Sequence, residues 1–190
     1  INDNVEIAIE VGADGVHVGQ SDLACARARA LLGPDKIIGV SAHNVEEAVA
    51  AQDAGADYLG AGAAFVTSTK GDARPIPHAM YRAITDAVDI PVVASVVADN
   101  ELVDEKIQAG AAILNVAAGA ATTQVVRSIR ERHPEMPIMA SGGKSEDSII
   151  ATIEAGADAI VWTPPTTLEL QKQMMSVYRG EDPTGRIAGH

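Results

Sequence analysis

The chain has 190 residues, 47% of them hydrophobic and 21% charged, with a net charge of −12. One domain with a sizeable buried core is expected at this length and composition. The acidic balance argues against a nucleic-acid-binding protein or one that binds an anionic membrane surface, and it still allows a local site for a small phosphorylated molecule. Cys25 is the single cysteine, so no intramolecular disulfide can form, and no apolar run reaches the roughly 18 residues of a membrane span. A reducing cytoplasm is the expected location.

A short phrase that contains Gly-Ala recurs in four copies along the chain: Val11-Gly-Ala-Asp-Gly-Val, Ala54-Gly-Ala-Asp-Tyr-Leu, Ala109-Gly-Ala-Ala-Ile-Leu and Ala155-Gly-Ala-Asp-Ala-Ile. Its glycines are Gly12, Gly55, Gly110 and Gly156. Each copy predicts a helix end, a turn and a buried strand, because glycine readily adopts the left-handed conformation that ends a helix. Further apolar runs fill the intervals. Strands are therefore expected at 15–19, 37–41, 58–62, 91–95, 112–117, 137–141 and 159–163. Helices are expected at 4–11, 22–32, 44–54, 78–87, 100–109, 121–132, 145–155 and 167–178.

This alternation lacks one strand, which would come before the first helix. If Ile1 is the last residue of that strand, the count becomes eight strands and eight helices. We therefore predict a (β/α)8 TIM barrel with a truncated first strand, forming one domain over 1–190 with a tail at 181–190. The alternative is an open doubly wound sheet, which the regular repeat and the lack of a Gly-x-Gly-x-x-Gly motif after a strand disfavour. A truncated strand would expose backbone groups that homo-oligomer formation could cover.

The last two predicted strands end in residues that suit phosphate. Ser141-Gly-Gly-Lys follows one strand and Thr163 follows the next, at the usual phosphate site of such barrels. The candidate phosphate-binding residues are Gly142, Gly143, Lys144 and Thr163, because glycine lets backbone N–H groups approach an anion. The alternative is that the glycines form a tight turn and Ser145 caps the next helix.

Two histidines lie near predicted strand ends. His17, between two valines inside a strand, is expected to be a hydrogen-bonded residue of the barrel interior. His43 follows Ser41 at a strand end and is the better functional candidate. No zinc-binding spacing of histidine and cysteine occurs in the chain.

Several phrases in the first half are specific to one family: Ile1-Asn-Asp-Asn-Val, Gly12-Ala-Asp-Gly-Val-His-Val-Gly-Gln-Ser-Asp-Leu, Ile38-Gly-Val-Ser-Ala-His, Gly55-Ala-Asp-Tyr-Leu-Gly-Ala-Gly and Phe65-Val-Thr-Ser-Thr-Lys-Gly-Asp. On these phrases, residues 1 to about 94 resemble thiamin phosphate synthase. That family is a (β/α)8 barrel that joins a hydroxymethylpyrimidine diphosphate to a thiazole phosphate with Mg²⁺.

The resemblance implies a set of site residues. By motif, Asp3 and Asp22 would be the Mg²⁺ ligands, although each also has an alternative role as the N-cap of the following helix. Ser41 and Lys70 would be the catalytic residues. Thr67 and Thr69 would help them to bind pyrophosphate and the thiazole phosphate. An active chain would then be a transferase.

The chain departs from the family in two places. A complete synthase has about two βα units before Ile-Asn-Asp, and they carry part of the pyrimidine diphosphate site. After Pro91 the family continues into a Gly-Gly phosphate loop, whereas this chain reads Ser95-Val-Val-Ala. We therefore expect partial pyrophosphate or phosphate binding with Mg²⁺ rather than full synthase activity.

The second half, from residue 91 to 180, resembles a different and uncharacterised phosphate-site barrel. This resemblance rests on Ile113-Leu-Asn-Val-Ala and Ala140-Ser-Gly-Gly-Lys. One hypothesis is a barrel recombined near residues 90 to 95, by nature or by an engineer. Such a scaffold would bind phosphate after its last two strands and catalyse nothing. A natural, divergent family is the other hypothesis.

Overall fold

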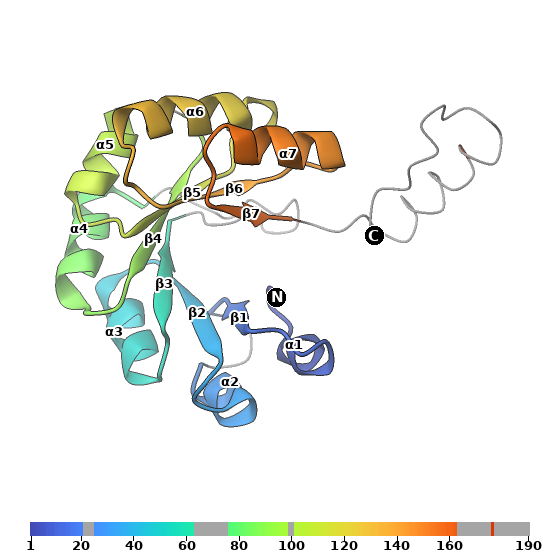
Figure 1. Cartoon of the computed structure of the whole chain (residues 1–190). Helices are drawn as coiled ribbons and strands as arrows, with labels where there is room; N and C mark the ends of the chain where they lie inside the picture. The colour runs from blue at the N-terminus through green and yellow to red at the C-terminus, as the bar shows by residue number, and fades with distance from the viewer. Residues whose placement is uncertain (21–24, 63–75, 99–100, 163–175, 177–190) are drawn as a thin grey trace.

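The computed structural model describes residues 1–20, 25–62, 76–98, 101–162 and 176. Seven parallel strands form one sheet in sequence order (Figure 1). They are β1 (Gly15–Val18), β2 (Ile37–Ala42), β3 (Tyr58–Ala61), β4 (Val92–Val96), β5 (Ile113–Val116), β6 (Ile138–Ser141) and β7 (Ala159–Val161). All seven predicted strands are confirmed. Because consecutive strands are neighbours throughout, the order has no switch point and the doubly wound alternative is wrong.

Helices follow the strands and cover the outer side of the curled sheet (Figure 1). They are α1 (Val5–Glu10), α2 (Cys25–Leu32), α3 (Val45–Asp53), α4 (His78–Ala87), α5 (Glu101–Gln108), α6 (Thr122–Arg132) and α7 (Glu146–Glu154), with a 3-10 turn, η1 (Gly119–Ala121), before α6. The eighth predicted helix, at 167–178, lies outside the described residues except for residue 176. None of the helices in the described part of the chain is both long and apolar enough to cross a membrane.

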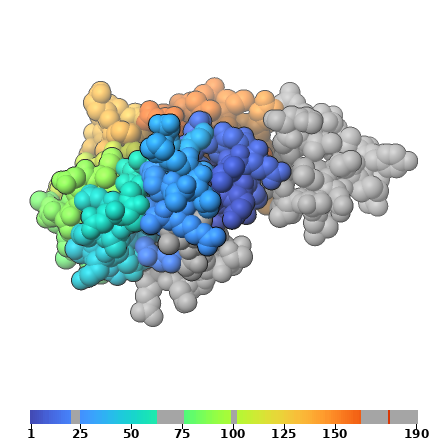
Figure 2. All heavy atoms as spheres, turned by 90° about the horizontal axis from the view of Figure 1, so that it is seen from below, coloured from blue at the N-terminus to red at the C-terminus, as the bar shows by residue number. Residues whose placement is uncertain are grey.

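Residues 1–3 pair with β1 as the end of a parallel strand would. Asn2 forms a parallel bridge with His17, whose backbone N–H donates to the carbonyl of Ile1 at 2.8 Å. The Asp3 N–H in turn donates to the His17 carbonyl at 2.8 Å. This pairing is the one expected of Ile1 as a strand end. In the space-filling view, residues 1–18 and the atoms of β2 and α2 form one continuous surface (Figure 2).

The closed barrel is not what the described residues show. No pairing among them joins β7 to residues 1–3, so the sheet is a curled half-barrel with two edges. Both edges are too short to form many hydrogen bonds with each other, because β7 has three residues and residues 1–3 make one isolated bridge.

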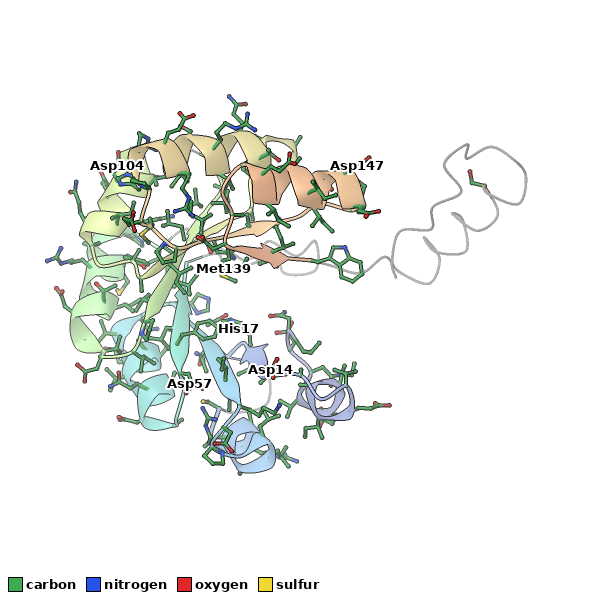
Figure 3. All side chains as sticks on the ribbon, viewed as in Figure 1. Asp14, His17, Asp57, Asp104, Met139 and Asp147 are labelled. Atoms are coloured by element: carbon green, nitrogen blue, oxygen red, sulfur yellow. The ribbon has the colours of Figure 1, made fainter. Side chains whose placement is uncertain are left out.

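The two faces of the sheet differ in chemistry because side chains alternate along each strand. The face toward the helices is aliphatic and buried, with residues such as Ile38, Leu59 and Leu114 fully buried. The inner face carries the alternate residues, as the labelled His17 and Met139 show (Figure 3). Most of the polar strand residues lie on this inner face.

Arg29, on α2, ties three connections together at the amino ends of the strands. Its guanidinium donates to the carbonyls of Gly33, Lys36 and Gly55 at 2.5–3.2 Å. It also pairs with the Asp57 carboxylate at 2.5 Å, and Asp57 accepts the N–H of the second β2 residue, Ile38. One side chain therefore fixes the start of β2 against the start of β3.

Arg130, on α6, repeats this arrangement about 100 residues later. It donates to the carbonyls of Pro134, Met136 and Gly156 and pairs with Asp158 at 2.6 Å. The Asp158 carboxylate accepts the N–H of Ile138 at 2.8 Å. Each half of the chain therefore has the same arginine clamp at the same place in its βα units.

Removing a clamp should destabilise the fold. We expect Arg130→Ala to lower the free energy of unfolding by about 3 kcal/mol, because several half-buried carbonyls and a carboxylate lose a charged donor. Arg127→Ala is the matched control, since Arg127 lies on the same helix and is exposed. Urea unfolding followed by circular dichroism measures both. Equal stability of the two variants would show that the clamp contributes nothing.

The second clamp also predicts a pH dependence. The Ile138 N–H, aided by Arg130, lowers the pKa of Asp158 despite an opposing effect of burial. A group whose pKa is lower in the folded state stabilises the fold above its unfolded pKa, about 3.9, and this contribution is lost as the pH falls through the folded pKa. The stability gap between the native chain and Asp158→Asn should therefore narrow from pH 7 to about pH 3. Urea titrations at several pH values test this, and a constant gap would contradict it.

Candidate functional site

Polar inner-face residues gather near the carboxyl ends of the strands. They are His17 on β1, Ser41 on β2, Ser95 on β4, Asn115 on β5 and Ser141 on β6. Ser141 is the last residue of its strand, and each of the others is the last but one. In α/β barrels this end of the sheet holds the active site.

His17 is the centre of a hydrogen-bonded group in the first half. Its ring contacts two side chains, with Nδ1 at 3.0 Å from the Tyr58 hydroxyl and Nε2 at 3.0 Å from Ser41 Oγ. The ring is buried, as expected for an interior histidine, at 8% exposure. Burial also raises the pKa of Tyr58, so its hydroxyl keeps its proton at neutral pH and is able to donate a hydrogen bond.

Gly39 makes this group possible. It lies on β2 between His17 on β1 and Tyr58 on β3, in register with both. A Cβ at Gly39 would lie 2.1 Å from the Tyr58 ring and 2.5 Å from His17 Nδ1. The absence of a side chain therefore lets His17 and Tyr58 meet across the intervening strand.

Asp3 lies next to this group. Its backbone is fixed to the His17 carbonyl, and Asn2 Nδ2 donates to its carboxylate at 2.8 Å. Its φ of 62° is left-handed, a conformation that no other described non-glycine residue adopts and that is often found at functional sites. The alternative role of Asp3 as an N-cap is wrong, because Asn4 caps α1 by accepting the Ile7 N–H.

Ser41 is half-buried and held from two sides. His17 contacts its hydroxyl, and Gln20 Nε2 donates to its carbonyl at 2.6 Å. Asp3 and Ser41, two of the implied site residues, are thus both joined to β1, Asp3 through its backbone and Ser41 through the His17 ring. The other implied residues of this half, Asp22, Thr67, Thr69 and Lys70, lie outside the described residues.

His43, the histidine favoured from sequence, has a local role. Its ring Nδ1 and its backbone N–H both meet Glu47 Oε2, each at 2.9 Å. Burial opposes ionisation of Glu47, but the bonds from His43 and Asn44 together lower its pKa. Asn44 also accepts the Glu47 N–H and caps α3. These contacts fix the first turn of α3.

The loop after β6 shows the features of the alternative turn and cap. The Gly142 N–H donates to the carbonyl of Val161, the last residue of β7, at 3.1 Å, so this donor is already paired within the sheet. Ser145 and Ser148 form a capping box at the start of α7, and Ser148 Oγ donates to the Gly142 carbonyl. The other two predicted phosphate residues of this loop are Gly143, with a φ of 74°, and Lys144, which is exposed. Thr163 lies outside the described residues.

A Mg²⁺ site in this half would be built on carboxylate oxygens. No group of three or more histidine, cysteine, aspartate or glutamate side chains gathers in the described part of the chain. Mg²⁺ does not require one, because it binds through one or two carboxylates and keeps several waters. The exposed carboxylate of Asp3, beside β1, is a suitable oxygen ligand for this ion.

The fold and this site define a parallel α/β protein of the TIM-barrel type with its polar residues at the strand carboxyl ends. The family model for thiamine monophosphate synthase matches residues 1–120, and the chain belongs to this family. A thiamine-phosphate synthase of Clostridium acetobutylicum is 46% identical over 127 residues, which are 67% of this chain and 60% of that protein. One of Methanobrevibacter smithii is 53% identical over 94 residues, 50% of this chain and 45% of that protein. The chain thus spans about half the length of these relatives.

Solved structures agree with the family and the fold. The thiamine phosphate pyrophosphorylase of Pyrococcus furiosus matches with a TM-score of 0.56 and 34% identity, covering 69% of this chain and 66% of that one. A mandelate oxidase matches with a TM-score of 0.65 over 83% of this chain and 58% of that one. Its identity of 14% shows a common fold alone.

Sequence reasoning missed Tyr58 as part of this site. Tyr58 is the first residue of β3, far from the strand end where functional residues were sought. Its hydroxyl reaches His17 because the strands are staggered, with Gly39 opposite Tyr58. The available signal was a glycine in the middle of β2, which marks the close approach of neighbouring side chains.

Filling the space at Gly39 should therefore break this group. We expect Gly39→Ala to lower the free energy of unfolding by about 1–3 kcal/mol, the usual range for an overpacked site. The cost should be smaller in a Tyr58→Ala background, where the ring that meets the new Cβ is gone. Urea unfolding of the four chains in this cycle measures the difference. Additive costs would mean that Gly39 does not make room for Tyr58.

Proposed function

We propose that the first half of this chain binds a pyrophosphate group with Mg²⁺ at the carboxyl ends of β1 and β2. The observation that carries the proposal is the fixed position of Asp3 on the strand edge beside His17, which contacts Ser41. The thiamine-phosphate synthase family supports it, because its substrates are phosphorylated. Mg²⁺, when bound, neutralises the charge of the pyrophosphate oxygens.

In this proposal Asp3 and Asp22 hold the ion, and Ser41 binds the anion. The Tyr58 hydroxyl donates to His17 Nδ1, which places the ring proton on Nε2, facing Ser41 Oγ. Ser41 Oγ then accepts a hydrogen bond from His17 Nε2–H, and its own O–H can donate to a pyrophosphate oxygen. A buried tyrosine thus sets the direction of the Ser41 donor.

Lys70, Thr67 and Thr69 complete this site in the proposal as donors to phosphate oxygens. Lysine supplies a positive charge, and threonine hydroxyls supply hydrogen bonds. Full synthase activity would need further groups that stabilise the charge on a leaving pyrophosphate in the transition state. Each 1.4 kcal/mol of lost transition-state stabilisation lowers the rate about tenfold. Binding without rapid turnover is therefore the expected behaviour.

A second candidate is a scaffold that binds phosphate after β6 and catalyses nothing. The left-handed Gly143 and the exposed Lys144 at the start of α7 favour it. The donation of the Gly142 N–H to Val161 disfavours it, since that donor is already used. We therefore rank it below the Mg²⁺ site.

Calorimetric titration with inorganic pyrophosphate separates the two candidates. We expect binding that requires Mg²⁺ and is weakened at least tenfold by Asp3→Asn or Asp22→Ala. Asp14→Asn is the matched control, because Asp14 is a fully exposed carboxylate at the opposite end of β1. Binding of phosphate without metal, lost in Lys144→Ala, would favour the scaffold instead.

A further inference from the structure

The two arginine clamps and the strand registers define which residues of the two halves are equivalent. Ile38 and Ile138 each donate a backbone N–H to the clamp aspartate, so Ser41 and Ser141, three residues later, occupy equivalent positions. His17 is in register with Gly39, and Asn115 is in register with Met139, two residues before those serines. His17 is therefore equivalent to Asn115.

The next strand pair extends the equivalence. Asn2 bridges to His17, and Ser95 is in register with Asn115. The second half thus places Ser95, Asn115 and Ser141 where the first half has Asn2, His17 and Ser41. The side chains of the second-half set, Ser95, Asn115 and Ser141, carry hydroxyl and amide groups and no charge.

The side chains that neighbour the two sets differ in size. In the first half, Gly39 is small and its neighbour Tyr58 is large; in the second half Met139 is large and its neighbour Ala159 is small. The large side chain therefore stands on β3 in the first half and on β6, one strand earlier, in the second half. Ala159, which has no hydroxyl, occupies the position equivalent to Tyr58. The second set therefore lacks the partner that holds His17 in the first.

One member of the second set has an unused polar atom. The Ser95 hydroxyl is buried at 7% residue exposure and has no hydrogen-bond partner in the described part of the chain. Ser141 is half-buried, and none of the described hydrogen bonds involves its hydroxyl. A buried hydroxyl without a partner is unfavourable and is a natural place for the hydrogen-bonding group of a ligand.

We propose that Ser95, Asn115 and Ser141 form a second binding site, which takes the hydroxyl-bearing part of a polyol phosphate. The uncharged side chains suit neutral hydroxyls, and Lys144, three residues after Ser141 in the loop that follows β6, supplies a positive charge for the phosphate. The site uses neither Asp3 nor Mg²⁺, so it is separate from the pyrophosphate site.

The probe for this site is glycerol 3-phosphate, compared with inorganic phosphate in calorimetric titrations without metal. The native chain should bind glycerol 3-phosphate at least tenfold more tightly. Ser95→Ala and Ser141→Ala should each weaken that binding about fivefold to tenfold, because each variant removes one hydroxyl that donates to the ligand. Both variants remove one atom, and unchanged thermal unfolding will show that they fold.

Two results would overturn the proposal. One is equal affinity of the native chain for the two probes. The other is a loss of glycerol 3-phosphate binding in Ser41→Ala with none in Ser141→Ala, which would place the polyol in the first half. Failure of the Mg²⁺ pyrophosphate site leaves these results unaffected, because the titrations contain no metal and compare residues of the second half.

Discussion

The strict alternation of side chains along a parallel strand is the constraint on which this structure depends. It places Val16 and Val18 against the helices and leaves His17, between them, on the inner face. The same rule places Ser95 and Asn115 on that face from strands that otherwise read as apolar. A shift of one residue in any register would bury the polar groups among the helices and expose the aliphatic ones.

The arginine clamps hold the registers at the other end of the sheet. Arg29 and Arg130 each join a helix, the turn before a strand and the start of the next strand. They lie at the amino ends of the strands, whereas the candidate sites lie at the carboxyl ends. The clamps and the candidate sites therefore lie at opposite ends of the sheet, the separation of stability and function that is usual in barrels. The recurrence of the clamp also shows that the two halves are built on one plan, although the family model matches only residues 1–120.

Much of the fold could be predicted from sequence because its signals are local. The four Gly-Ala phrases together with the further apolar runs predicted all seven strands, and the family motif suggested Asp3 and Ser41 as site residues. Barrel closure could not be predicted, because it depends on pairing between distant edges, and the described sheet is open. Tyr58 was missed for a similar reason: its contact with His17 depends on the stagger of three strands. The bond of His43 to Glu47 was missed as well, because it arises only once α3 has formed.

The central claim is that an ion binds at Asp3, beside the strand that carries His17. Mn²⁺ is an oxygen-binding ion that can replace Mg²⁺ and broadens the NMR signals of nearby nuclei. In the presence of pyrophosphate, Mn²⁺ should broaden the backbone amide signals of Asp3, His17 and Ser41, and leave those of Asn115 and Lys144 sharp. Broadening centred on Lys144, or spread evenly over the acidic surface, would contradict the account.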